Sequence, residues 1–240
     1  MTNKKDSLGD RMKDRYENRS RFFLPRRSAV IIRVDGKAFH TFTRGMQRPF
    51  DSVFIKAMDE VALCLVQEIQ GAACAFVQSD EVSVLLTDYQ KRDSDAWFDY
   101  NVQKMASVSA GIATAAFAQA FEGFATKGRR LPVFDSRCFS IPDFVEVHNY
   151  FVWRQKDCER NSIQMVAQSH FSQKQLHGKS CADMHELLHT KGVNWNNFTA
   201  REKRGGLAKR FQEGVSITGA PIFSKTDDLR MIIPLQGYEE

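Results

Sequence analysis

The sequence predicts an α+β fold in which two helices cover one face of an antiparallel sheet. Three observations support this fold class: β-branched strand segments, two long stretches with helical character, and a short connection between two strands. The chain has 240 residues, of which 42% are hydrophobic. That length and composition allow a sizeable core to be buried in a single compact body.

The first predicted strand covers residues 28–34 and is followed by Asp35-Gly36, a dipeptide typical of a sharp turn. Residues 51–70 then carry apolar side chains at three- and four-residue spacing. This periodicity predicts an amphipathic helix, and Asp51 is suited to cap its first turn.

Two further β-rich segments, residues 74–77 and 82–86, are separated by only four residues. Such a short connection predicts a hairpin. Its tip would carry two acidic side chains, Asp80 and Glu81.

The segments after the hairpin complete a βαββαβ motif, and the rest of the chain forms an appendage. Residues 97–121 are rich in Ala, Ser and Met, which predicts a second helix, and residues 133–141 predict a strand. The order strand, helix, hairpin, helix, strand is that of a ferredoxin-like sheet with both helices on one face. We therefore expect a core of residues 1–142 with a basic N-terminal helix. Residues 143–240 would form an appendage of helices and polar loops packed on it.

Charge and cysteine content restrict the function classes. The net charge of +5 is unevenly spread, because an acidic middle segment is flanked by basic ones. This pattern suits a cation site between polyanion-binding flanks, although on charge alone a solvated N-terminal helix with ordinary surface charge is the better explanation. Five scattered cysteines without a CxxC pair resemble neither a disulfide framework nor a thiolate zinc site. With no apolar run long enough for a membrane span, we expect a soluble cytoplasmic protein that has no membrane partner.

The acidic residues at the strand ends are candidates for a metal site. Asp35 follows the first strand, and Asp80 and Glu81 occupy the hairpin tip. If these strands pair, the carboxylates come within a few ångströms, since neighbouring strands lie about 4.8 Å apart. Two Mg²⁺ ions need such oxygen ligands on rigid elements, and many enzymes that transfer phosphoryl groups use two metal ions. Ordinary turn chemistry explains each acidic residue taken separately.

Five segments resemble, in the same order, signatures of the histidine tRNA guanylyltransferase family. They are RVDGKAFHTF at 33–42, RPFD at 48–51, QSDE at 78–81, FDSR at 134–137 and WRQKDC at 153–158. The resemblance spans roughly residues 8–206. It implies a fold similar to the palm of DNA polymerases, and nucleotide addition in the 3′-to-5′ direction at a site with two Mg²⁺ ions.

The same resemblance implies roles for individual residues. Asp35, the Gly36 carbonyl and Asp80 would coordinate Mg²⁺, with Asp35, Asp80 and Glu81 as the catalytic set. The residues implied for the nucleoside triphosphate are Lys37, Ala38, Phe39, His40, Arg48, Asp51, Ser79 and Lys104. The residues implied for the tRNA 5′ end or a second nucleotide are Arg33, Arg137, Asn161, Lys203 and Arg204. For Lys104, a single solvated lysine on a helix is an equally good explanation.

One departure from the family pattern bears on the substrate. The eukaryotic guanylyltransferases continue the WRQxDC segment with His-Ile-Asn-Asn, whereas this chain reads Glu159-Arg-Asn-Ser162. It thus resembles the guanylyltransferase-like branch found in bacteria, archaea and some phages. That branch implies template-dependent repair of 5′-truncated tRNA from nucleoside triphosphates, with ATP or GTP activating a 5′-monophosphate. The family resemblance also implies a homotetramer.

Two other functions fit parts of the sequence. His185-Glu-Leu-Leu-His189 matches HExxH, in which two histidines one helical turn apart bind zinc in metallopeptidases. This alternative needs a third ligand, for which Glu202 is a candidate, and predicts Zn²⁺-dependent peptide hydrolysis. The second alternative is a palm-like module that binds tRNA without catalysis, which the presence of the carboxylates disfavours.

Overall fold

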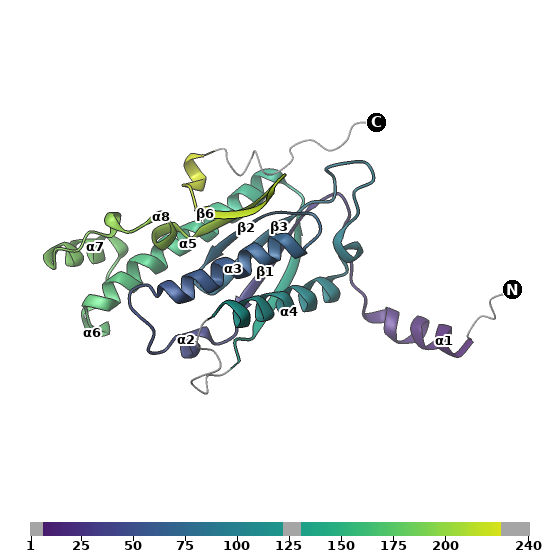
Figure 1. The fold of residues 1–240 in the computed structure, drawn as a ribbon, viewed down its shortest axis with the longest axis horizontal. Coiled ribbons are helices and arrows are strands. Elements are labelled where there is room, and N and C mark those ends of the chain that lie inside the picture. Colours follow the sequence, from purple (N-terminus) through teal and green to yellow (C-terminus); the bar gives the residue numbers. More distant parts are fainter. Residues whose placement is uncertain (1–6, 122–130, 227–240) are drawn as a thin grey trace.

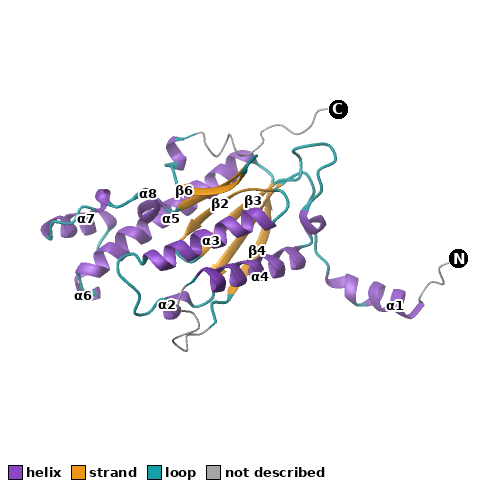
Figure 2. Ribbon diagram, in the orientation of Figure 1, coloured by secondary structure: helices purple, strands orange, loops and turns teal. Residues whose placement is uncertain are grey.

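The computed structural model describes residues 7–121 and 131–226 and shows a six-stranded antiparallel sheet with helices on both faces (Figures 1 and 2). The strand order is β4-β1-β3-β2-β5-β6. The strands are β1 (Ala29–Gly36), β2 (Ala72–Gln78), β3 (Glu81–Leu86), β4 (Phe134–Ile141), β5 (Gly206–Phe211) and β6 (Gly214–Gly219). The α-helices are α1 (Ser7–Arg15), α2 (Phe39–Phe42), α3 (Ser52–Glu68), α4 (Val102–Ala120), α5 (Phe144–His170), α6 (Gln173–Leu176), α7 (Cys181–Thr190) and α8 (Ala200–Arg204).

The predicted fold class is confirmed. Strands β4, β1, β3 and β2 form the antiparallel order of the ferredoxin-like motif, and α3 and α4 lie together on one face of the sheet (Figure 1). Helix α3 begins where Asp51 caps it, because the Asp51 carboxylate accepts hydrogen bonds of 3.0 Å from the backbone N–H groups of Val53 and Phe54. A short 3₁₀ turn, Trp97–Tyr100, precedes α4, whose start is capped by Asn101.

The sheet separates two hydrophobic layers. Alternate residues of β1 face opposite sides: Val30 and Ile32 pack in the layer under α3 and α4, whereas Ala29 and Ile31 pack in the layer under α5. All four side chains are essentially inaccessible to solvent. The two-sided burial makes β1 rigid, and β1 ends at Asp35 and Gly36.

The segment after residue 143 differs from its prediction as helices and polar loops. It contains β5 and β6, which extend the sheet through pairing of β5 with β2. It also contains α5, which covers the sheet face opposite α3 and α4. The strand signal is weak because β5 and β6 are short and begin with glycine, so pairing with the buried strand β2 decides their conformation rather than local propensity.

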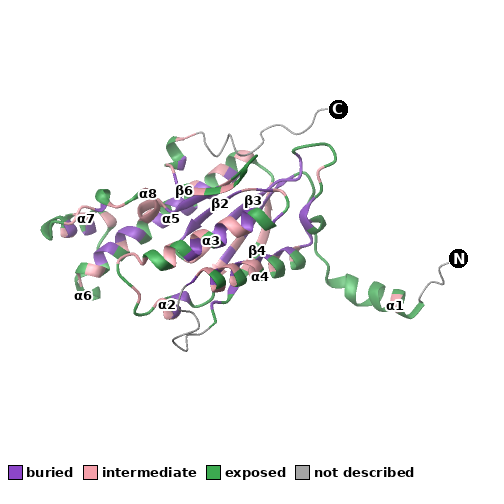
Figure 3. Cartoon of the chain, viewed as in Figure 1, coloured by how far each residue is buried: buried purple, intermediate pink, exposed green. Residues whose placement is uncertain are grey.

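The N-terminal helix α1 projects away from the sheet and is exposed to solvent along its length (Figure 3). It carries no buried residue, and Leu8, Met12 and Tyr16 are exposed. None of the described helices is both long enough and apolar enough to cross a lipid bilayer.

Candidate functional site

The acidic residues at the ends of β1 and of the hairpin lie together. In the antiparallel pairing of β1 with β3, Asp35 is the register partner of Glu81. The next backbone contact is a hydrogen bond of 3.0 Å from the Gly36 N–H to the Asp80 carbonyl oxygen. The structure therefore places the backbone of Asp35-Gly36 directly beside that of Asp80-Glu81.

A third strand adds another acidic residue, Asp135, which sequence reasoning did not select. Asp35 is the register partner of Asp135 across β1 and β4. Side chains of register partners project from the same face of a sheet, so Asp35 has an acidic neighbour on each side. The FDSR segment contained this residue, but only the strand register shows that it adjoins Asp35.

Burial and mutual repulsion make the two central carboxyls hard to ionise. Burial, together with the charge of Asp35, raises the pKa of Asp80 to about 6. Burial raises the pKa of Asp35 as well, with further contributions from Glu81 and Asp135, while Arg137 and Arg33 act in the opposite direction. A divalent cation between these carboxyls would relieve the repulsion.

The donor set fits a hard cation such as Mg²⁺. Carboxylate oxygens and a backbone carbonyl are its preferred protein ligands, with water and substrate phosphates completing the coordination. Across residues 7–121 and 131–226, no three His, Cys, Asp or Glu side chains gather closely enough to hold a metal ion by themselves. Two carboxylates and the Gly36 carbonyl would therefore form an open site rather than a closed cage. Gly36 is required here because a Cβ atom would lie only 2.4 Å from the Phe39 ring.

The raised pKa of Asp80 predicts a pH effect on the metal-free protein. The folded chain holds the Asp80 proton more tightly than the unfolded chain, so stability is greatest below the ordinary pKa of 3.8 and falls as pH rises through about 6. The loss amounts to no more than about 3 kcal/mol, since each pKa unit corresponds to about 1.4 kcal/mol. Urea unfolding in a chelating buffer across this pH range measures it, with Asp80→Asn as the comparison. If the unfolding free energy of Asp80→Asn depended on pH as strongly as that of wild type, the effect would not come from Asp80.

A cavity of about 640 Å³ opens beside the acidic residues. It brings together eight of the predicted site residues: Gly36, Ala38, Phe39, His40, Arg48, Asp51, Ser79 and Asp80. Arg44 also lines it, so the cavity is lined by two arginines and a histidine as well as by Asp51 and Asp80. Its size and mixed charge suit a nucleoside triphosphate whose phosphates are bridged to the acidic residues by a cation. Lys37 lies on the other side of the turn, where its N–H donates to the Val133 carbonyl oxygen at 2.8 Å.

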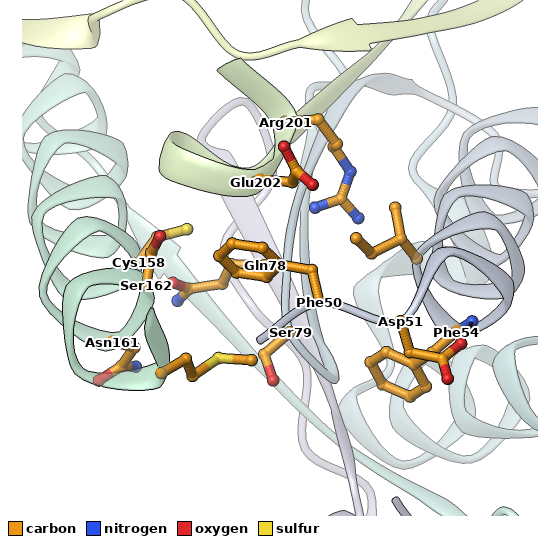
Figure 4. Close-up of a pocket in the computed structure, with 12 residues that line it drawn as sticks. Phe50, Asp51, Phe54, Gln78, Ser79, Cys158, Asn161, Ser162, Arg201 and Glu202 are labelled. Carbon is orange, nitrogen blue, oxygen red and sulfur yellow. Dashed lines mark hydrogen bonds between the residues drawn. The ribbon is translucent and has the colours of Figure 1, made fainter. Parts of the chain in front are cut away.

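A smaller, mostly apolar cavity of about 70 Å³ adjoins the first, between α3, α5, α8 and the end of β2 (Figure 4). Asn161 of α5 lines it, and Asp51 and Ser79 line both cavities. The Asp51 carboxylate is engaged by the start of α3 and by the Gln47 N–H at 3.0 Å. Asp51 thus shapes the wall between the two cavities through its capping bonds.

Apart from Lys37 and Arg48, the predicted lysines and arginines form two groups and one isolated residue. Arg33 and Arg137 are register partners on β1 and β4, two residues from Asp35 and Asp135. Lys203, in α8 with Arg204, donates to the Asn196 carbonyl oxygen at 2.6 Å.

Lys104 is not brought to the acidic residues. Its ammonium lies 5.7 Å from the centre of the Phe98 ring, near the start of α4. Phe117, which contacts Phe39 at the site, is thirteen residues further along α4, a distance of about 20 Å along the helix axis.

The HExxH segment gains no support from the structure. His185 and His189 lie on α7, but the ring of His185 packs against Trp195 with centroids 5.6 Å apart. Glu202, the candidate third ligand, accepts hydrogen bonds from the Thr199 N–H and hydroxyl at 2.9 and 2.7 Å as part of the α8 cap. Within the described part of the chain, no third side chain joins the two histidines in a metal-binding group.

Comparisons with known proteins give one consistent result. The sequence model of a family described as tRNAHis guanylyltransferase matches residues 9–142, more than half of the chain. A solved structure of a bacterial tRNA(His) guanylyltransferase-like protein in complex with ATP is 43% identical and covers 95% of this chain and 100% of its own, with a TM-score of 0.90. A second bacterial structure of this kind, in complex with GTP, is 39% identical, covers 96% and 100%, and has a TM-score of 0.80. The tRNA(His) guanylyltransferase of Saccharomyces cerevisiae is 28% identical over 227 residues, which are 87% of this chain and 90% of the relative.

Proposed function

Because the chain belongs to the tRNAHis guanylyltransferase family and is a nucleotidyltransferase, we propose that it adds nucleotides to the 5′ end of tRNA in the 3′-to-5′ direction. Its substrate is a tRNA with an incomplete 5′ end, and the opposite strand of the acceptor stem selects each base by pairing. The observation that carries this proposal is the meeting of Asp35 and Asp80 beside a cavity that suits a nucleoside triphosphate.

Asp35, Asp80 and the Gly36 carbonyl would hold two Mg²⁺ ions. When bound, these ions lower the pKa of the attacking hydroxyl and neutralise charge on the phosphates. The chain's own residues orient the reactants: His40 and Arg48 line the cavity that receives the triphosphate. Arg33 and Arg137 present guanidinium groups on the neighbouring strands, suited to the phosphates of the tRNA 5′ end.

The transfer joins the 3′-hydroxyl of the incoming nucleotide to the α-phosphorus of an activated tRNA 5′ end. With a 5′-triphosphate the bond to the β-phosphate breaks and pyrophosphate leaves. A 5′-monophosphate is first activated by ATP or GTP at the same acidic residues: its oxygen attacks the α-phosphorus of that nucleotide and pyrophosphate leaves. The nucleoside monophosphate attached in this way is then the leaving group when the 3′-hydroxyl attacks. The complexes of the two bacterial relatives with ATP and with GTP support the use of both nucleotides.

We also propose how the chain is organised. The family match over residues 9–142 supports a catalytic core of residues 1–142. Within residues 143–226, α5 packs on the sheet of this core and β5 and β6 extend it. Lys203, Arg204 and Asn161 would then contribute to tRNA or second-nucleotide binding from outside the core. We propose a cytoplasmic homotetramer, as the family resemblance implies.

Incorporation assays on truncated tRNA test the proposal. The substrate is a tRNA lacking its first nucleotide, with either a 5′-triphosphate or a 5′-monophosphate, offered with Mg²⁺ and each nucleoside triphosphate in turn. We expect incorporation only of the base complementary to the opposite strand, and a change of incorporated base when that opposite base is changed. Incorporation of G regardless of the opposite base would contradict templating. Absence of any incorporation would contradict the proposed reaction.

A further inference from the structure

Helix α5 is joined to the tip of the β2–β3 hairpin by an ion pair between Arg154 and Glu81. Nε of Arg154 donates to Glu81 Oε1 at 2.8 Å, and Nη2 donates to Oε2 at 2.7 Å. The two side chains are only 9% and 13% exposed. A bidentate pair of this kind fixes orientation as well as distance.

The remaining acceptor capacity of Glu81 is also used. Its Oε1 accepts from Gln78 Nε2 at 3.3 Å and from Ser83 Oγ at 3.4 Å. With two further hydrogen bonds from Arg154, the carboxylate has four donors. Glu81 is therefore built as an anchor, although it directly follows Asp80 in the sequence.

Arg154 is itself fixed from several sides. Its Nη2 also donates to Asp157 at 3.1 Å, and its guanidinium carbon lies 4.5 Å from the centre of the Trp153 ring. The helix that carries it is anchored to the sheet by Val147 and Phe151, which are fully buried. The ion pair thus connects a rigid helix to a hairpin tip where Ser79 has a left-handed backbone with φ of +45°.

We propose that Arg154 is a positioning residue that acts through Glu81 to hold the hairpin tip so that Asp80 faces Asp35. The inference rests on the proposed function. Arg154 lies beyond residue 142, where the family match ends, so the pair makes the acidic site depend on the later part of the chain. Without Arg154, Glu81 would be an uncompensated carboxylate beside Asp35 and Asp80. Removing both partners would avoid that charge, because the largest penalty comes from leaving one member of a buried pair alone.

Three variants test the proposal: Arg154→Met, Glu81→Gln and the double variant. We expect Arg154→Met to lower kcat for nucleotide addition about a hundredfold, as a displaced catalytic group does, with little change in KM for the tRNA. The double variant should recover to within about tenfold of wild type, since the uncompensated charge is gone. The matched control is Arg160→Met, which removes an arginine that is 57% exposed, also bonded to Asp157 and outside the contacts of Glu81. It should stay close to wild type.

Calorimetric titration of each variant with Mg²⁺ and ATP, in the absence of tRNA, provides a second readout. Arg154→Met should weaken the binding of Mg²⁺ and ATP about tenfold or more, and the double variant should restore that binding. If Glu81 were a metal ligand, Glu81→Gln would be as inactive as Asp80→Asn and the double variant no better, which would overturn the proposal. A lower free energy of unfolding in urea for Arg154→Met, with unchanged kcat and unchanged affinity for Mg²⁺ and ATP, would also overturn the proposal. If wild type adds nothing to tRNA, the proposed function fails, while the titration still decides the role of Arg154.

Discussion

Replacement of either Asp35 or Asp80 by Asn should lower the rate of nucleotide addition more than about a hundredfold, because metal-assisted charge stabilisation is worth several kcal/mol. Asn keeps the size of the side chain but loses the charge that binds Mg²⁺. Both changes should leave the metal-free protein folded, and Asp80→Asn should stabilise it near neutral pH because the pKa of Asp80 is raised to about 6. Single-turnover assays on 5′-triphosphorylated truncated tRNA measure the chemical step directly.

Asp135→Asn provides the matched comparison. Asp135 adjoins Asp35 in the sheet, but one of its oxygens accepts from Arg137 at 3.3 Å. We expect a rate within about tenfold of wild type, since Asp135 affects the electrostatic potential at Asp35 rather than binding the cation. Asp35 or Asp80 variants as active as the Asp135 variant would remove the two acidic residues from the mechanism.

Local sequence signals were sufficient for the motif that carries the acidic residues. The β-branched run before Asp35 predicts a strand, and the four-residue connection around Asp80 predicts a hairpin. Strand pairing then places Asp35 beside the hairpin tip that carries Asp80. Asp51 illustrates the same point at a helix start, because capping depends on a few neighbouring backbone groups. Such features depend on short-range chemistry that one sequence displays.

Other parts of the site depend on contacts between residues far apart in sequence. Arg154 stands in a recognisable WRQ segment, but its partner Glu81 is 73 residues away, and no local pattern indicates the pair. Strand β5 likewise exists because the edge of β2 offers it backbone partners. Lys104 illustrates a different limit: its motif position matches the family, but within one chain the length of α4 separates it from the acidic residues, so its role in nucleotide binding stays a prediction.

The Phe39 ring links the hydrophobic core to the candidate phosphate-binding turn, and Phe39→Ala should cost about 3–5 kcal/mol of unfolding free energy. The ring is 3% exposed and lies within 4.9–6.1 Å, centroid to centroid, of four other phenylalanines. It also fills the space where Gly36 has no side chain. Urea unfolding measures the loss, and Phe211→Ala, which removes a 55% exposed ring, should stay within about 0.5 kcal/mol of wild type.

The same substitution distinguishes an anchor from a direct nucleotide contact. Phe39 lines the large cavity, yet most of its ring is buried among aromatic side chains, so its main task is to hold residues 37–40 against the end of β1. Phe39→Leu keeps an apolar side chain there and should recover most of the stability, since changes that conserve core volume are tolerated best. If the ring only anchors the turn, KM for ATP should recover together with stability in Phe39→Leu. A KM that stays raised in a stable Phe39→Leu protein would instead show that the aromatic ring touches the nucleotide.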